Sequence, residues 1–260
     1  MAIDLRGVCG NMERSFDLEA LIADLEIRVG YSELPGGAEG LSTELNGESW
    51  IFVSPSVTSA RRRRFTLAHE LGHWILAHPS SCGPLDILGR SSVPEEKAAN
   101  EFAANLLMPP RLFRADVARA APRMAEFERL ANVYAVSRTA AALRFLKFTA
   151  DACALVCISP ARTWVAKSAS AKHHWINGTL PDRYSSVDLR IGEARVPASN
   201  WLESCEASRS LVCEEIADAG PKTWLILLTD LPEAADEVDD LSEREAEEEL
   251  SRRRQSFRRY

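Results

Sequence analysis

Apolar residues in the first part of the chain recur mostly at helical spacing. Between residues 15 and 30 they fall three or four positions apart, which predicts an amphipathic helix over this stretch. Residues 33–40 are rich in glycine and proline and predict a loop, and residues 49–53 predict a short strand. A polar and basic segment, residues 58–64, then leads into a helix that we expect over residues 65–77.

More helices are predicted before residue 150, and strands after it. Pro94 and Glu95 make a good helix start, because proline suits the first turn and acidic groups stabilise the positive end of the helix dipole. The predicted helices cover residues 96–107, 111–121, 127–134 and 137–147. The strand candidates are residues 152–158, 163–167, 187–191 and 224–229, while residues 202–219 suit either a strand or a helix.

This order of elements predicts an α+β protein with several parts. We expect a mostly helical domain with a small sheet at residues 1–125 and a helix pair at residues 126–150. A smaller α+β domain should follow at residues 151–232. Residues 233–260 are acidic and then arginine-rich, a composition typical of a solvated, charged tail.

The composition favours a globular protein outside the membrane. The chain is 46% hydrophobic and 27% charged, and it has no apolar run of membrane-spanning length. Its start lacks the layout of a secretory signal, so we expect a cytoplasmic protein. The net charge of −7 argues against broad coating of nucleic acid. Cys153 and Cys157 lie in an apolar run and are interpreted as small buried residues.

The most informative motif is H-E-x-x-H, formed by His69, Glu70 and His73. Two histidines four residues apart on a helix share one face, so both imidazoles can bind one metal ion. This pattern is typical of zinc metalloproteases, in which the glutamate acts as general base. His78 follows near the end of the same helix, and we expect its side chain to point away from the metal face.

A catalytic zinc site needs a third protein ligand and an open position for water. No third histidine continues the motif, so the helix that begins near Glu95 is the place to look. Glu96 is the favoured ligand because it shares a face with small alanines that would allow close packing on the motif helix. Glu101 and then Glu95 are the alternatives. Asn100 lies one turn beyond Glu96 and is predicted to orient a ligand by hydrogen bonding.

This set predicts a zinc-dependent peptide hydrolase. Zinc would lower the pKa of a bound water, and Glu70 would take the proton of that water and later pass it to the leaving amine. Zinc is the cofactor that two imidazoles and a carboxylate suit best, although the donor set alone does not separate it from manganese.

Two blocks of sequence resemble the ImmA/IrrE family of metallopeptidases, which are gluzincin-like. The first runs from Arg63 to His73, and the second, residues 96–109, resembles the family's third-ligand helix. The resemblance covers residues from about 15 to 150 and implies a zincin-like fold. It carries the zinc ligands onto His69, His73 and Glu96 and the catalytic glutamate onto Glu70.

The same resemblance implies a partner. Family members act on helix-turn-helix transcriptional repressors, so the expected substrate is such a repressor, whose cleavage would derepress stress-response or mobile-element genes. Residues 130–144 are similar to the helix-turn-helix-like segment that follows the family's peptidase core, and we favour a packing or substrate-docking role for them over DNA binding. Residues 152–232 resemble, in strand order only, a GAF-like sensor domain.

Other functions remain open from the sequence. The chain could be a DNA-binding or anti-repressor module with an inactive metal site, or a toxin–antitoxin partner without peptidase turnover. The intact set of predicted ligands favours the enzyme.

Overall fold

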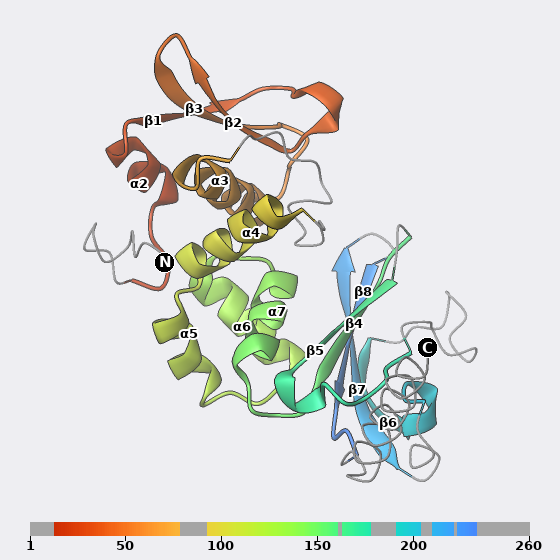
Figure 1. The fold of residues 1–260 in the computed structure, drawn as a ribbon. Coiled ribbons are helices and arrows are strands. Elements are labelled where there is room, and N and C mark those ends of the chain that lie inside the picture. Colours follow the sequence, from red (N-terminus) through yellow and green to blue (C-terminus); the bar gives the residue numbers. More distant parts are fainter. Residues whose placement is uncertain are drawn as a thin grey trace, which may run out of the picture.

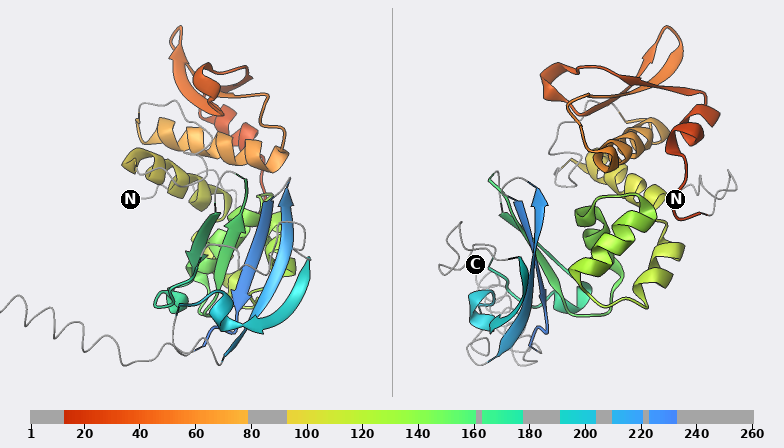
Figure 2. Two further views of the ribbon diagram at one scale, coloured as in Figure 1. Left: turned by 90° about the vertical axis from the view of Figure 1, so that its right-hand side faces the viewer. Right: turned by 180° about the vertical axis from the view of Figure 1, so that it is seen from behind.

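The fold places a small sheet and helices at one end and a larger sheet at the other (Figure 1). It is taken from a computed structural model, which describes residues 13–78, 93–160, 163–177, 191–203, 210–220 and 223–232. Within these residues six α-helices and two β-sheets make an α+β protein, as the sequence predicts. The views in Figure 2 show the small sheet lying over α3 (Ala60–Ile75), while α4 (Pro94–Leu107) lies against the other side of that helix.

The small sheet contains three strands in the order β1-β3-β2. They are β1 (Ile27–Tyr31), β2 (Gly40–Leu45) and β3 (Glu48–Val53), with β1 parallel and β2 antiparallel to β3. A short 3-10 helix, Pro35–Gly37, connects the first two. Ile51 and Val53 are fully buried beneath the sheet, so this face packs on the helices.

The sequence predicts one element of this region wrongly and omits another. The helix predicted over residues 15–30 is only α2 (Leu18–Asp24), capped by Asp17, and Ile27 already belongs to β1. Glu26, with φ of 59°, reverses the chain between the two elements, so the apolar spacing that suggested one helix spans a helix and a strand. The second strand of the sheet, β2, lies partly in the predicted loop and was not expected.

The basic lead-in is also helical. Ser59 caps α3 and its hydroxyl accepts a hydrogen bond from the backbone N–H of Arg62, so the helix begins five residues earlier than predicted. The four arginines of this turn each contact a residue outside α3, as described below.

The remaining helices follow the predicted order. They are α4 (Pro94–Leu107), α5 (Pro110–Val117), α6 (Met124–Tyr134) and α7 (Arg138–Phe148). Ala135 ends α6 in the left-handed conformation, with φ of 51°, and Ser137 caps α7. This tight turn gives the helix pair that the sequence predicts over residues 126–150.

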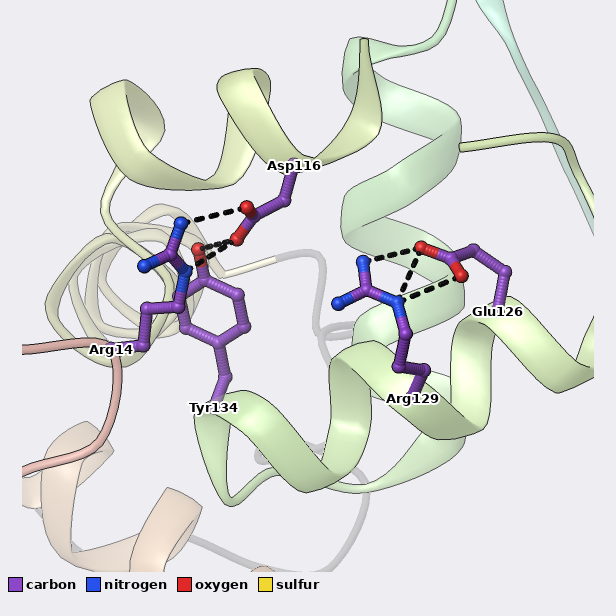
Figure 3. Close-up of polar contacts among 5 residues, drawn as sticks. All are labelled: Arg14, Asp116, Glu126, Arg129 and Tyr134. Atoms are coloured by element: carbon purple, nitrogen blue, oxygen red, sulfur yellow. Dashed lines mark hydrogen bonds and ion pairs between the residues drawn. The ribbon is translucent and has the colours of Figure 1, made fainter. Parts of the chain in front are cut away.

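An ion pair fastens the start of the described chain to this helical part (Figure 3). Arg14 donates two hydrogen bonds of 2.8 Å to the carboxylate of Asp116 on α5. The hydroxyl of Tyr134 on α6 donates to the same carboxylate at 2.7 Å. The segment before α2 is therefore held on two helices at once.

The C-terminal sheet has five strands in the order β5-β4-β8-β7-β6, all antiparallel. The strands are β4 (Ala154–Ile158), β5 (Thr163–Lys167), β6 (Gly192–Pro197), β7 (Leu211–Gly220) and β8 (Thr223–Thr229), with 3-10 helices at Ala169–Ala171 and Ala198–Asn200. The two predicted strands at residues 152–158 and 224–229 lie next to each other at its centre. The expected strand at 187–191 falls almost wholly outside the described residues, and β6 was not expected.

The two faces of this sheet pack against different partners. Leu155 and Leu227 belong to the same hydrophobic core as the helices, whereas Val156, Ile226 and Trp201 form a second core on the far face. Cys153 and Cys157 are buried free thiols, as predicted. The sheet is therefore joined to the helical part through apolar contacts. The charged tail at 233–260 lies outside the described residues. Within the described part of the chain, no helix is long and apolar enough to cross a membrane.

Candidate metal centre

The H-E-x-x-H residues lie in the middle of α3, in its buried half. His69, Glu70 and His73 each have no exposed surface. The Nε2 atoms of His69 and His73 lie 3.1 Å apart, because side chains four residues apart on a helix stack one turn above each other. Both imidazoles thus present a donor atom to one point.

Glu96 reaches the same point from the first turn of α4. One of its carboxylate oxygens lies 3.2 Å from Nε2 of His69, and the other lies 3.4 Å from Nε2 of His73. Glu96 is 9% exposed, and Pro94 begins its helix. The structure thus brings together the three residues that the sequence favours, with one donor atom from each within 4.8 Å of the others.

These distances suit a tetrahedral metal ion. Two ligands of a tetrahedral zinc, each about 2.0–2.1 Å from the metal, should lie about 3.3–3.4 Å from each other. The separation of 3.1 Å between the two imidazole Nε2 atoms is close to this edge length, and each Nε2 lies 3.2 or 3.4 Å from a different oxygen of the Glu96 carboxylate. Two imidazoles and one carboxylate are also a donor set that zinc accepts. The group could therefore hold a metal ion between the two helices.

Gly72 allows α4 to come this close to α3. A Cβ atom on Gly72 would lie 3.2 Å from both the Cα and the carbonyl oxygen of Ala99, and 3.0 Å from the ring of Phe102. The backbone of α4 therefore occupies the space that a side chain at position 72 would need. Ala99 and Ala103 are fully buried, in agreement with the predicted close packing of the small residues of this helix.

Glu70 faces the edge of the small sheet. A Cβ atom on Gly40, the first residue of β2, would lie 2.8 Å from both Cγ and Cδ of Glu70. The glutamate side chain therefore packs directly on the backbone of β2. Gly40 is not predicted as part of the site, because a single glycine beside a predicted loop carries no specific signal of such a contact.

The alternative carboxylates lie elsewhere. Glu101 is half-exposed and accepts hydrogen bonds of 2.7 and 2.8 Å from Lys147 on α7. Glu95 is exposed. Neither belongs to the group of donors around His69. Asn100 donates a hydrogen bond of 2.9 Å to the backbone carbonyl of Glu96, and an orienting role for it stays a prediction.

The expectation that His78 points away from the metal face stays a prediction, because its donor atoms are not part of the group formed by His69, His73 and Glu96. The ring of His78 lies edge-on to the ring of His73, with 5.4 Å between the centroids. Ala77 has φ of 54°, and this left-handed residue turns the chain back at the end of α3, so helical spacing does not apply to position 78. His78 therefore flanks the candidate centre.

Comparison with known proteins agrees with the class of site. Residues 22–146 match the family model described as the IrrE N-terminal-like domain, a family of M78 peptidases. The site therefore lies in a metallopeptidase-type domain. The matched segment belongs to the ImmA/IrrE family, and it contains every residue of the candidate centre. No curated protein matches the chain significantly by sequence.

One solved structure extends the likeness beyond this domain. The fold is similar to that of a Mycobacterium tuberculosis transcriptional regulator, with a TM-score of 0.54 and 17% sequence identity. The match covers 86% of this chain and 73% of the other. Because the family domain spans 125 residues out of 260, the structural match includes part of the C-terminal sheet as well. At this identity the likeness concerns the fold alone.

Proposed function

We propose that the protein is a zinc-dependent endopeptidase that cleaves a helix-turn-helix transcriptional repressor. The observation that carries the proposal is the buried group of His69, His73 and Glu96, with Glu70 on the same helix. The membership of the chain in a peptidase family supports the same reaction class.

Each residue of the group has one role in this proposal. His69, His73 and Glu96 would hold the zinc ion, which when bound supplies a Lewis acid and lowers the pKa of a coordinated water. The Glu70 carboxylate accepts a proton from the attacking water while the oxygen of that water bonds to the peptide carbonyl carbon. Glu70 then returns the proton to the amine nitrogen as the C–N bond breaks.

The edge of the small sheet suits an extended peptide. Among the described strands β2 pairs only with β3, so it is an edge strand of the three-stranded sheet. Gly40 at the start of β2 packs on Glu70, which places this edge beside the proposed general base. A substrate segment that adds to β2 by backbone hydrogen bonds would therefore pass close to Glu70.

The packing of the helix pair supports a structural role over direct DNA binding. A recognition helix needs an exposed face that can enter the major groove. Ala141, Ala142, Phe145 and Leu146 of α7 are all buried, and α7 packs against both α6 and the C-terminal sheet. We therefore assign this segment a packing role. The choice of a repressor as substrate rests on the family resemblance.

The direct test is cleavage of repressors encoded beside the gene. The purified full chain, loaded with zinc, is incubated with each repressor, and the products are identified by mass spectrometry. Cleavage should be abolished by a chelator and restored by zinc. Glu70→Gln should retain zinc and lose cleavage by about 100-fold or more, since general-base catalysis contributes roughly that factor.

Two results would overturn parts of the proposal. Full cleavage by Glu70→Gln would remove the role of Glu70. A stable complex with an intact repressor, formed by zinc-loaded wild type, would instead favour a non-catalytic partner of the toxin–antitoxin kind. Glu101→Gln is the matched control, because it changes a glutamate of α4 outside the group of donors.

A further inference from the structure

The start of β2 is held on α3 by a two-point ion pair. The carboxylate of Glu39 accepts hydrogen bonds of 2.9 Å from Nε and 2.8 Å from Nη2 of Arg62. This fork-to-carboxylate geometry is directional as well as charged. The backbone carbonyl of Glu39 also accepts a 2.9 Å hydrogen bond from the N–H of Ser54, so both its backbone and its side chain are fixed.

The pair lies close to the candidate centre along the helix. Arg62 precedes His69 by seven residues, which is nearly two full turns, so the two side chains project from almost the same face of α3. Glu39 is joined directly to Gly40, whose backbone contacts the side chain of Glu70. Glu39 and Arg62 therefore connect the strand that contacts Glu70 to the helix that carries Glu70.

The other three arginines of this turn contact different elements. Arg61 reaches Asn132 and Glu128 on α6. Arg63 lies over the ring of Tyr31, and Arg64 lies 4.8 Å from the ring centroid of Phe16. Among the described contacts of these four side chains, only that of Arg62 joins α3 to the beginning of β2.

We infer that the Glu39–Arg62 ion pair is a positioning device for the carboxylate of Glu70. It fixes Gly40 against the glutamate and so limits the side-chain conformations that Glu70 can adopt. The side chain of Glu39 is 13% exposed and that of Arg62 is 34% exposed, so solvent screens this ion pair less than it screens a pair on the open surface. The inference rests on the proposed function, because it assigns the pair a part in the action of Glu70.

The experiment compares Arg62→Gln and Glu39→Gln with Arg28→Gln. The control removes the ion pair between Arg28 and Glu48, which is 58% and 46% exposed and lies in the same small sheet. Each full-length variant is loaded with zinc, its metal content is measured, and kcat and KM are determined on the cleaved repressor. Amide hydrogen exchange of residues 40–45 reports the mobility of β2 independently of activity.

Loss of the pair should act on kcat. We expect Arg62→Gln to lower kcat by about tenfold or more, because displacement of a catalytic group by about 1 Å can cost up to 100-fold. KM and zinc content should stay near the wild-type values, while β2 exchanges faster. The exchanged pair, Glu39→Arg with Arg62→Glu, should recover part of kcat. Glu39→Gln provides the same test if Arg62→Gln does not fold.

Two outcomes separate this inference from the proposed function. If wild type cleaves a repressor and both pair variants retain the kcat of Arg28→Gln, the positioning role is refuted while the peptidase stands. If wild type binds no zinc and cleaves nothing, both the proposed function and the catalytic role of the Glu39–Arg62 pair are refuted. If amide hydrogen exchange of β2 is unchanged in both Arg62→Gln and Glu39→Gln, the ion pair does not hold β2 in place and the inference is refuted.

Discussion

The contact between Gly72 and the backbone of α4 allows a quantitative prediction for Gly72→Ala. In a helix interior, alanine is more favourable than glycine by about 1 kcal/mol, so the substitution would stabilise α3 if space were available. The added Cβ would instead lie 3.2 Å from the Cα and carbonyl oxygen of Ala99. Overpacking of this kind costs about 1–3 kcal/mol. The expected net effect is a loss of about 0–2 kcal/mol.

The same substitution should weaken metal binding. The added Cβ fits only if α4 shifts, because two of the three atoms nearest to it belong to the backbone of α4. Glu96 lies on α4 and would move with it. We expect zinc affinity to fall by about tenfold, the lower end of the effect of disturbing groups that support metal ligands. Stability is measured by urea unfolding with a chelator present, and affinity by competition with a zinc indicator.

The control for this prediction uses the difference in helix propensity between alanine and glycine. Ala98 is an exposed residue of α4, so Ala98→Gly should cost about 1 kcal/mol from propensity alone and leave zinc affinity unchanged. If Gly72→Ala is more stable than wild type by that same amount and binds zinc equally well, the close approach of the two helices does not set the geometry of the centre.

Two further predictions concern the metal and pH. Glu96→Gln should lower zinc affinity by at least about tenfold, whereas Glu101→Gln should retain it; equal zinc content after dialysis in both variants would contradict the ligand assignment. Hydrogen bonding from Arg14 holds the pKa of Asp116 below its ordinary value. The stability that the Asp116 carboxylate gives the folded protein is therefore complete above about pH 4, and it is lost as the pH falls through the pKa of Asp116 in the folded state. Asp116→Asn should therefore lower the free energy of unfolding by about 1 kcal/mol at pH 7, and the effect is this small because Arg14 is half-exposed. In urea unfolding at pH 3, the difference between the variant and wild type should be smaller.

Local sequence signals predicted the parts of the centre that lie within single helices. The spacing of His69 and His73 needs only a helix, and the face that Glu96 shares with Ala99 favours Glu96, which the structure places beside both imidazoles. The central strands β4 and β8 were also predicted, because strands buried on both faces carry unbroken apolar runs.

The missed features depend on contacts between distant segments. Ile27 continues the apolar spacing of α2, so the sequence predicts a helix where β1 lies. The reversal at Glu26 uses a residue that is not typical of turns. The short edge strand β2 begins within a glycine-rich loop, and its pairing with β3 determines its structure. No local pattern reveals that Arg62 would reach Glu39, which lies 23 residues away.

The arrangement also explains why the H-E-x-x-H pattern alone does not make a centre. One helix supplies two imidazoles at no further cost, but the carboxylate of Glu96 arrives only if a second helix approaches at backbone distance, and Gly72 permits that approach. Glu70 is confined only if β2 approaches equally closely, and Gly40 permits that. Added volume at Gly72 would press on the backbone of α4, and added volume at Gly40 would displace the side chain of Glu70. A chain with the same motif and larger residues at both positions should therefore keep the helix and lack the site.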